Sequence, residues 1–370
     1  MATDWAAVRA QFPALQNWTF LNTATFGQLP RAAVDAISRH LAHRDRQACF
    51  DFLNWFDDMD RIRAKLARLV ACAADDIGFV PNAASGLAIL LNGMEWSSGD
   101  EVITLRGEFP NLPYAASALE RLGVRLVEAE GWDAFYSSLT PRTRLALLST
   151  VNYSTGFRPP VADASRILHE RGILLYLDGT QSVGALRFDT AAIRPDFLAV
   201  DGYKWMICPN GAAFISVPGH VRAWLRPNVI GWRSDRGWRN VDYLNHGAPV
   251  LPDSAERYEG GMIPFAMLYA MEASVDLMLS LGVQAIEDRV LDLAGGTAQL
   301  LRRCGATVEG EGSPIVAAHF PGRDVSRMAA SLKEQGILVA ARHGFLRVSP
   351  HLYNNESDLE RLEHALARQG

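Results

Sequence analysis

The sequence lacks most of the features that mark secreted, membrane-bound or metal-binding chains. Its cysteines are widely spaced and form no CxxC pair, which argues against a disulfide framework and against a zinc site. Apolar runs such as residues 173–177 are far shorter than the ~20 residues of a membrane-spanning helix. Residues 1–12 resemble neither a secretory signal nor a transit peptide, so we expect a cytoplasmic protein without a membrane partner. The four cysteines are Cys49, Cys72, Cys208 and Cys304.

A strong charge imbalance is also absent. Thirty-six basic residues against forty-one acidic residues give a formal net charge of −5, which is too mild to predict a nucleic-acid surface. The chain has no G-x-G-x-x-G motif, which disfavours a nucleotide-binding oxidoreductase. A small-molecule substrate is the remaining expectation.

The length and the hydrophobic content predict two lobes. A single core stops growing at roughly 250–300 residues, and this chain has 370 residues, of which 49% are hydrophobic. We expect N-terminal helices and a large domain over residues 1–263, followed by a small α+β domain over residues 264–370. Because neither a repeat nor a low-complexity tract separates them, the two should pack closely.

The order of apolar runs predicts an α/β fold. Short Val-, Ile- and Leu-rich runs alternate with segments whose apolar residues recur at three- and four-residue spacing. This alternation is typical of a mainly parallel sheet, here of seven strands, with helices on both faces. The expected strands are 77–80, 101–105, 124–127, 145–151, 173–178, 197–201 and 212–217. The expected helices between them are 85–94, 112–122 and 161–172.

Further helical patterns flank this α/β core. Two of them, residues 30–47 and 55–71, precede it, and the aromatic-rich stretch 50–56 joins them, which suggests packing across the sheet or against a partner subunit. The region after Pro264 predicts a smaller α+β unit. Its expected elements are a long helical region to Arg303, strands at 315–320, 337–342 and 345–348, and helices at 324–335 and from residue 356 onward.

Two strand ends carry side chains that suit a catalytic site. Asp178 closes one apolar run, and Lys204 follows another. Ligands of open α/β sheets bind beyond the carboxyl ends of the strands, where a carboxylate can pair with a pyridinium nitrogen and a desolvated lysine can attack an aldehyde. A turn or helix cap for Asp178 and a surface position for Lys204 are the alternatives. The combination of the two residues favours a site.

A phosphate could bind where the first strand runs into a helix. The small residues Ala83 and Ala84 follow Asn82 at this turn, and the free N–H groups of a helix N-terminus attract a dianion. Alone, this signal is weak, because Ser85 could simply be an N-cap.

These segments together resemble the class V aminotransferase branch of the fold-type I enzymes that use pyridoxal phosphate (PLP). The superfamily includes cysteine desulfurases, kynureninases, isopenicillin-N-epimerase-like proteins and several aminotransferases and lyases. The resemblance covers nearly the whole chain. Its motifs are residues 20–27, 82–86, 108–111, 151–156, 178–185, 202–205 and 347–355.

The resemblance implies a role for each matching residue, with residues 1–263 containing the PLP-binding domain. Lys204 would hold the cofactor as a Schiff base, and Asp178 would pair with the ring nitrogen. Arg347 would bind the substrate carboxylate, for which its planar fork is well suited, with Thr25 and Phe26 beside it. A surface ion pair is the alternative for Arg347.

The remaining implied residues surround the cofactor. The aromatic ring of Phe109 would stack on the cofactor ring; the alternative is a plain core aromatic. The amide side chains of Gln181 and Asn152 would lie near the phenolic oxygen. The phosphate would be held by Ala83, Ala84 and Tyr203. The full implied PLP-binding set is Ala83, Ala84, Phe109, Asn152, Asp178, Gln181, Asp201, Tyr203, Lys204 and Gly261.

Two departures from the family pattern narrow the expected activity. Desulfurases carry a nucleophilic cysteine shortly before the carboxylate-binding arginine, and residues 339–347 contain none. Met262 stands where relatives usually have a threonine that touches the partner subunit's phosphate. Either backbone N–H groups of Gly260 and Gly261 replace that hydroxyl, or the phosphate contact is rearranged.

We therefore expect a homodimeric PLP enzyme with shared active sites that acts on the α-amino group of a small amino acid or amino-acid conjugate. An aminotransferase-like activity is the first choice. A C–S or C–C lyase or an epimerase on the same scaffold is the alternative, and a non-catalytic PLP-fold binding protein is the alternative of another class.

Overall fold

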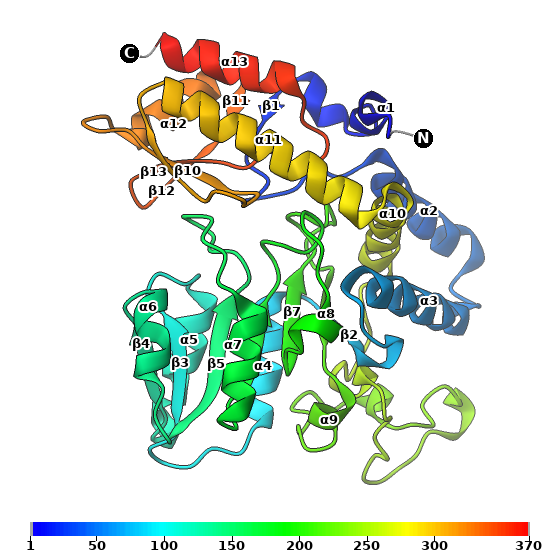
Figure 1. Ribbon diagram of the computed structural model, residues 1–370. Coiled ribbons are helices and arrows are strands. Elements are labelled where there is room, and N and C mark those ends of the chain that lie inside the picture. Colours follow the sequence, from blue (N-terminus) through cyan, green and yellow to red (C-terminus); the bar gives the residue numbers. More distant parts are fainter. Residues whose placement is uncertain (1–2, 369–370) are drawn as a thin grey trace.

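A seven-stranded sheet lies at the centre of the larger unit of the computed structural model, which describes residues 3–368 (Figure 1). The strands are β2 (Ile77–Val80), β3 (Glu101–Leu105), β4 (Arg125–Ala129), β5 (Thr143–Ser149), β6 (Leu174–Asp178), β7 (Phe197–Asp201) and β8 (Ala213–Ser216). Their order is β2-β8-β7-β6-β5-β3-β4, and β8 runs antiparallel to both of its neighbours. The other pairs are parallel, so the predicted mainly parallel α/β fold is confirmed.

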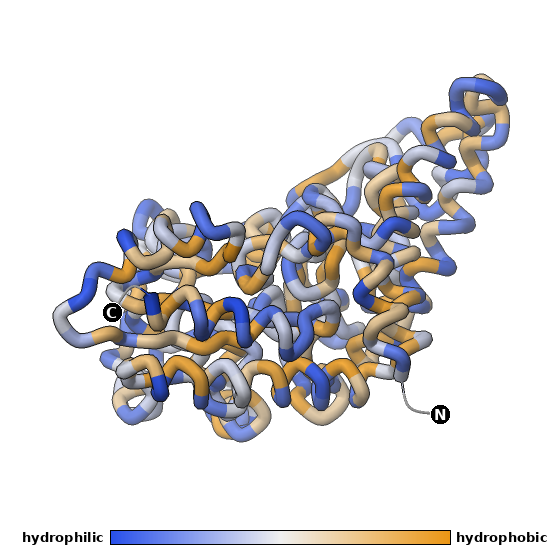
Figure 2. The backbone as a smooth tube through the Cα atoms, turned by 90° about the horizontal axis from the view of Figure 1, so that it is seen from above, coloured by the Kyte–Doolittle hydropathy of each residue, from blue (hydrophilic) through white to orange (hydrophobic). Residues whose placement is uncertain are grey.

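Helices cover both faces of this sheet. They include α3 (Phe52–Val70), α4 (Ala83–Gly93), α5 (Asn111–Ser117) and α7 (Val161–Glu170), with the short α6 (Trp132–Phe135), α8 (Thr190–Ile193) and α9 (Gly219–Arg222) in connections. On β5, Leu145 and Leu147 share a core with α4 and α5, whereas Ala146 and Leu148 share one with α3 and α7. Burial on both sides explains why the strands are continuous apolar runs. Hydrophilic and hydrophobic residues alternate along the helices (Figure 2), as in helices with one buried face.

The sheet brings the two predicted catalytic strand ends together. β6 and β7 are adjacent and parallel, with Asp178 opposite Ala199 in the register. Asp178 and Asp201 are the last residues of these strands, and Lys204 lies in the turn that follows β7. Asp178, Asp201 and Lys204 therefore lie at one edge of the sheet, where open α/β folds bind their ligands.

Long helices form the side of the larger unit next to β2 (Figure 1). They are α2 (Arg31–Gln47), α3 and α10 (Phe265–Leu281), and α10 packs along the other two. The ring of Phe265 meets the rings of Trp55 and Phe56 edge to face, at centroid distances of 5.4 and 4.9 Å. Part of the predicted aromatic stretch therefore packs inside this helix layer, while Phe50 stays 76% exposed.

The helical region predicted to continue to Arg303 consists of two helices. Gly282 separates α10 from α11 (Val283–Arg303) and has a φ of +86°, a conformation that favours glycine. The two helices bend by 86° at this point. In the described part of the chain, no single helix is long and apolar enough to span a membrane. Only α10 and α11 taken together have the required length and composition, and they form this bent pair.

The smaller unit is an antiparallel sheet covered by helices. Its strands are β9 (Thr307–Glu309), β10 (Val316–His319), β12 (Ala340–Arg342) and β13 (Phe345–Val348), and its helices beside α11 are α12 (Val325–Glu334) and α13 (Glu356–Ala367). The strand order over the described residues is β12-β13-β10-β9. Leu346 and Val348 of β13 point into a core shared with the helices.

The start of the chain also contributes to the smaller unit. α1 (Trp5–Arg9) is followed by β1 (Thr19–Phe20), which pairs in parallel with β11 (Ile337–Leu338). Arg9 at the end of α1 donates to the Asp358 carboxylate of α13 at 2.7 and 3.1 Å. The domain division after residue 263 stays a prediction, and residues 3–22 lie with the C-terminal unit.

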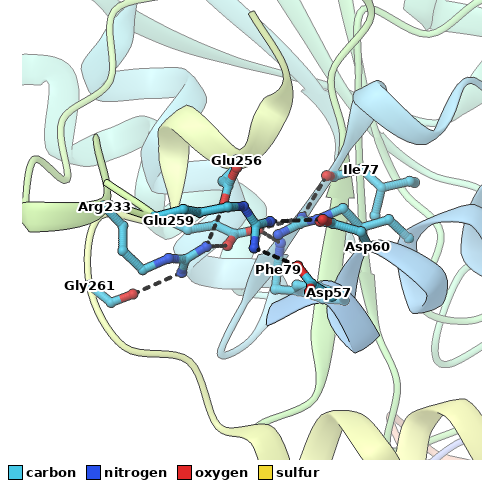
Figure 3. Close-up of polar contacts among 10 residues, drawn as sticks. Asp57, Asp60, Ile77, Phe79, Arg233, Glu256, Glu259 and Gly261 are labelled. Carbon is cyan, nitrogen blue, oxygen red and sulfur yellow. Dashed lines mark hydrogen bonds and ion pairs between the residues drawn. The ribbon is translucent and has the colours of Figure 1, made fainter. Parts of the chain in front are cut away.

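A buried ionic network fastens the loop before α10 to the sheet (Figure 3). Arg63 of α3 donates to Glu259 at 2.5 Å, and Arg233 donates to Glu256 and Glu259 at 2.6 and 2.9 Å. Glu259 also accepts a hydrogen bond from the N–H of Phe79 in β2 at 2.8 Å. Burial alone would raise the pKa of Glu259, but the Arg63 and Arg233 charges lower it below its usual value. Glu259 is therefore a buried anion on which three segments converge.

Candidate active site

Lys204 lies buried at the carboxyl edge of the sheet. Its Nζ atom is 5.2 Å from the centroid of the Phe109 ring and 5.4 Å from that of the Tyr203 ring. Burial lowers the pKa of Lys204 to about 8, although the negative charges of Asp178 and Asp201 oppose this effect. More of this amine is thus uncharged near neutral pH than in an ordinary lysine, which favours a nucleophilic or basic role.

A small pocket surrounds this amine and contains five of the predicted residues. Asp178 is 6% exposed, and its Oδ1 accepts a hydrogen bond from the N–H of Thr180 at 2.9 Å. The hydrogen bond fixes the carboxylate at the end of β6. The pocket is lined by Phe109, Asn111, Ser149, Tyr153, Asp178, Thr180, Gln181, Asp201 and Lys204.

The N-terminus of α4 lies beside this pocket. Asp201 accepts a hydrogen bond from the N–H of Ala83 at 2.9 Å, and Asn82 caps the helix by accepting from Ser85 at 2.8 Å. The N–H of Ala84 has no hydrogen-bond partner among the described residues. Burial, followed by the Asp178 charge, raises the pKa of Asp201 to about 6. The N–H of Ala84 thus remains open. The N–H of Ala83 is held by the carboxyl group of Asp201, which is readily protonated.

The two amide side chains predicted near the phenolic oxygen are already engaged. Gln181 lines the pocket, but it donates to the carbonyl of Ala24 at 3.1 Å and accepts from Trp205 at 2.8 Å. Asn152 donates to the carbonyl of Gly107 at 3.0 Å and accepts from the N–H groups that follow it in its turn. Asn152 therefore shapes the loop that carries Tyr153 and is not among the residues that line the pocket.

Residues 22–27 lie directly against the turn that carries Lys204. The N–H of Gly27 donates to the carbonyl of Tyr203 at 2.8 Å, and the Phe26 ring lies 5.0 Å from the Tyr203 ring. A Cβ atom on Gly27 would stand 1.9 Å from the carbonyl oxygen of Lys204. Only glycine permits this close approach, which brings Thr25 and Phe26 to the site.

Arg347 is a buried cation without an anionic partner. It is 2% exposed and donates to the backbone carbonyl of Tyr153 and, at 2.6 Å, to the hydroxyl of Thr25. Its Nε atom is buried without a hydrogen-bond partner, and no carboxylate of the described residues forms an ion pair with it. The alternative of a surface ion pair therefore does not apply to Arg347 among the described residues. An unpaired buried charge is costly, so a carboxylate from outside the chain would fit.

The predicted contact at Gly261 lies apart from the pocket of the same chain. The N–H of Gly261 donates to the carbonyl of Glu259 at 2.8 Å, and its own carbonyl accepts from Arg233 at 2.9 Å. Neighbouring Met262 is 63% exposed. The buried ionic network therefore holds this segment at the surface.

Several residues at or beside the pocket, among them Glu108 and Tyr153, had no individual role predicted from the sequence. Glu108 accepts from the N–H of Ser149 at 2.9 Å and from its hydroxyl at 2.5 Å. Burial, with a contribution from the Asp178 charge, raises the pKa of Glu108 to about 7. Glu108 and Tyr153 belong to motifs that carried the family resemblance, and their positions in those motifs were the available signal.

A chain of hydrogen bonds ties the turn after Lys204 to the C-terminal unit. His351 is fully buried and contacts the carbonyl of Trp205 at 2.8 Å. Burial lowers the pKa of His351 to about 4, so the neutral ring donates this bond. Because Trp205 in turn donates to Gln181, the position of Lys204 depends on both units.

Nearly the whole chain matches a known protein family. Residues 20–362 match the family described as aminotransferase class V. The chain belongs to this family. It is therefore an enzyme of a PLP-dependent family, as predicted.

Relatives of this class V family member have different named activities, and their sequence identities to it are similar. It is 25% identical to a probable cysteine desulfurase of Methanothermobacter thermautotrophicus, over 97% of this chain and 96% of the relative. It is 26% identical to isopenicillin N epimerase of Amycolatopsis lactamdurans, over 99% and 98% of the two chains. It is 24% identical to the uncharacterized aminotransferase YcbU of Bacillus subtilis, over 97% and 95%.

Solved structures agree with this class V assignment. A variant of C-DES with glycine covalently linked to its PLP cofactor matches with a TM-score of 0.90 at 22% identity, over 97% of this chain and 98% of that chain. The cysteine desulfurase CsdA of Escherichia coli matches with a TM-score of 0.87 at 22% identity, over 100% and 98%. At this level of identity the likeness establishes the fold.

The side chains at the pocket fit the cofactor of the class V family. A buried amine, a carboxylate and an aromatic ring converge there, and the open N–H of Ala84 lies at the adjacent helix N-terminus. The amine suits the aldehyde of the cofactor, the carboxylate its ring nitrogen, and the aromatic ring its ring face. The open N–H suits its phosphate.

Proposed function

We propose that this enzyme binds PLP at Lys204 and acts on the α-amino group of a small amino acid or amino-acid conjugate, with an aminotransferase-like activity. The observation that carries the proposal is the buried Arg347, which lacks an acidic partner among the described residues. Its charge contributes to the lowered pKa of Lys204, for which burial is the main cause. Arg347 also donates to the carbonyl of Tyr153, which lines the same pocket as Lys204. A substrate carboxylate on Arg347 would thus place the adjacent α-carbon near Nζ of Lys204.

The residues of the chain would divide the chemistry among them. Bound PLP supplies an electron-accepting ring that stabilises negative charge at the substrate α-carbon. Asp178 would hold a proton on the ring nitrogen, and Phe109 would cover one ring face. Nζ of Lys204, with its pKa lowered to about 8 by burial, would accept the α-proton and return it. Ala83, Ala84 and Tyr203 would hold the phosphate, with Asp201 in its protonated form where it meets the helix N-terminus.

The short β12–β13 hairpin favours this activity over desulfuration. Its turn consists of His343 and Gly344, so the hairpin itself carries no thiol. Cys208, next in sequence to the site, is buried, and burial raises its pKa to about 12, which makes it a poor nucleophile. Transamination, β-elimination and epimerisation share proton removal by the lysine, so lyase and epimerase activities stay as alternatives.

Replacing Arg347 tests the proposed carboxylate site. We expect Arg347→Lys to raise the KM of an α-amino acid substrate by about ten- to a hundredfold, because lysine cannot form the two parallel hydrogen bonds of a guanidinium. The corresponding amine without a carboxylate should be affected little. Steady-state kinetics with the matched pair of substrates measures both effects. Equal losses for the acid and the amine would show that Arg347 has a structural role instead.

We further propose a cytoplasmic homodimer with shared active sites. Large apolar side chains are exposed near the helix layer of α2 and α3 and along the loop before α10, among them Phe50, Ile230, Tyr243, Val250 and Met262. Segment 260–262, including Gly261, would reach the partner subunit's phosphate from this surface. The free cysteines fit a reducing compartment.

The dimer predicts a specific response to substitution. An obligate interface buries more than roughly 2,000 Å², so the assembly should survive dilution to nanomolar concentration in light scattering or sedimentation. Tyr243→Asp, at a side chain that is 82% exposed, should weaken the dimer by at least about tenfold because it buries a charge. Leu122→Asp, at a 40% exposed side chain beside β4, is the control. A monomer that stays active and loaded with PLP would contradict the proposal.

A further inference from the structure

Two arginines share the face of the β12–β13 hairpin that is turned away from the helices of the smaller unit. Ala340 pairs with Arg347, and Arg342 pairs with Phe345. Residues opposite each other and residues two apart along a strand lie on the same face of a sheet. Arg342 is therefore a diagonal neighbour of Arg347, whereas Leu346 points into the core on the opposite face.

Neither arginine is neutralised by the protein. Within residues 3–368, Arg342 and Arg347 form no ion pair with a carboxylate, and the guanidinium of Arg342 donates only to the carbonyl of the adjacent Ala341, at 2.8 Å. Arg342 is half-buried, so solvent does not fully surround its charge. Two like charges on diagonal positions repel each other, and bound anions would remove this repulsion.

The charge of Arg342 acts on the catalytic pocket. Burial is the main cause of the lowered pKa values of Lys204 and Arg347, and the Arg342 charge adds to both shifts. The same charge opposes the rise that burial causes in the pKa of Tyr153. Together with its position diagonal to Arg347 in the strand register, this places Arg342 close enough to the pocket to interact with a substrate that Arg347 holds.

The tip of the hairpin is fixed to the wall of the pocket. His343 contacts the hydroxyl of Tyr153 through Nε2 at 2.5 Å, and Arg347 donates to the carbonyl of Tyr153. The Tyr153 ring meets the Phe109 ring edge to face at 5.2 Å. Because both ends of Tyr153 are held by the hairpin, Arg342 has a defined position relative to the pocket.

We propose that Arg342 binds a second anionic group on the substrate, so that the preferred substrate is an amino acid whose side chain carries a carboxylate. This inference rests on the proposed function, because it takes Arg347 as the binding residue for the α-carboxylate. In this arrangement the two carboxylates of one substrate neutralise the two arginines, and a neutral side chain would leave Arg342 without a partner.

Calorimetric binding of simple acids to the PLP-loaded enzyme tests the second site without relying on turnover. Glutarate and valerate have the same chain length and differ by one carboxylate. We expect glutarate to bind about ten- to a hundredfold more tightly, the range for one hydrogen-bonded charged group. Arg342→Gln should remove this advantage and leave valerate unchanged, whereas Arg342→Lys should retain part of it.

Two further variants separate this inference from the proposed function. Arg347→Gln should weaken both acids, and Arg327→Gln, at a side chain that is 90% exposed on α12, should weaken neither. Equal binding of glutarate and valerate, or a glutarate advantage that persists in Arg342→Gln, would overturn the second site while the Arg347 effect stands. If no acid binds and no α-amino acid changes the absorption of the bound cofactor, the proposed function fails as well.

The same contrast is expected with amino acids. Glutamate should change the absorption of the bound cofactor at a concentration about ten- to a hundredfold lower than glutamine does. In Arg342→Gln the two concentrations should become similar. A wild-type enzyme that responds equally to both amino acids would contradict the acidic side chain.

Discussion

Lys204→Ala is expected to lower turnover by at least about a thousandfold, within the range that a positioned general base contributes. The chain has only three lysines, Lys65, Lys204 and Lys333. Lys65 is bound by Glu272 and Asp276 at 2.8 Å each, and Lys333 is exposed on α12. No other described lysine can therefore supply an amine to the pocket.

Borohydride reduction followed by peptide mass spectrometry identifies directly which lysine binds the cofactor. The wild-type enzyme should carry reduced cofactor on Lys204, and the alanine variant should carry none. Lys65→Arg and Lys333→Arg are matched controls that should keep the label and the activity. Reduced cofactor on either of those two residues, or near-normal turnover of Lys204→Ala, would refute the role of Lys204.

Much of the α/β core could be predicted because its strands are buried on both faces. β2, β3 and β7 begin and end at the predicted residues, since each is a short apolar run bounded by polar or turn residues. The proposed catalytic edge could be predicted for the same reason: a parallel sheet places the ends of β6 and β7 side by side, so Asp178 and Lys204 lie near each other.

Contacts between distant segments could not be predicted. The pairing of β1 with β11 joins residues more than three hundred positions apart, and such short strands have no periodicity of their own. The hydrogen bond from Ala83 to Asp201 also depends on tertiary packing, because the helix N-terminus read alone had open donors. The break at Gly282 was hidden by an apolar pattern that continues on both sides of it.

For the two arginines of the hairpin, the sequence motif and the structure give different information. The family resemblance gave Arg347 a role because its position matched a known pattern. Arg342 matched none, and only the strand register places it beside Arg347. A sequence states which charges exist, whereas the lack of a compensating carboxylate near them is visible only in three dimensions.

Glu259→Gln is expected to lower the free energy of unfolding by about 3–5 kcal/mol, the usual effect of removing one partner from a buried ion pair. The glutamine has nearly the same volume, and its carbonyl oxygen can still accept from the N–H of Phe79. Its NH2 group cannot accept from Arg233, so the variant removes the charge and one acceptor. Arg63 and Arg233 would then share a buried site with too little negative charge. Chemical denaturation with matched m-values measures the change.

The exposed pair Arg303–Glu363 provides the control. Its side chains are 58% and 36% exposed, so Glu363→Gln should cost less than about 1 kcal/mol. Because Glu259 joins β2 to the loop that ends at Gly261, its replacement should also weaken cofactor retention, through the strand that leads to Ala83 and through the loop. A small stability loss equal to that of Glu363→Gln would mean that water or rearranged side chains already compensate the buried charges. Normal stability with weakened PLP binding would instead assign Glu259 to the cofactor site alone.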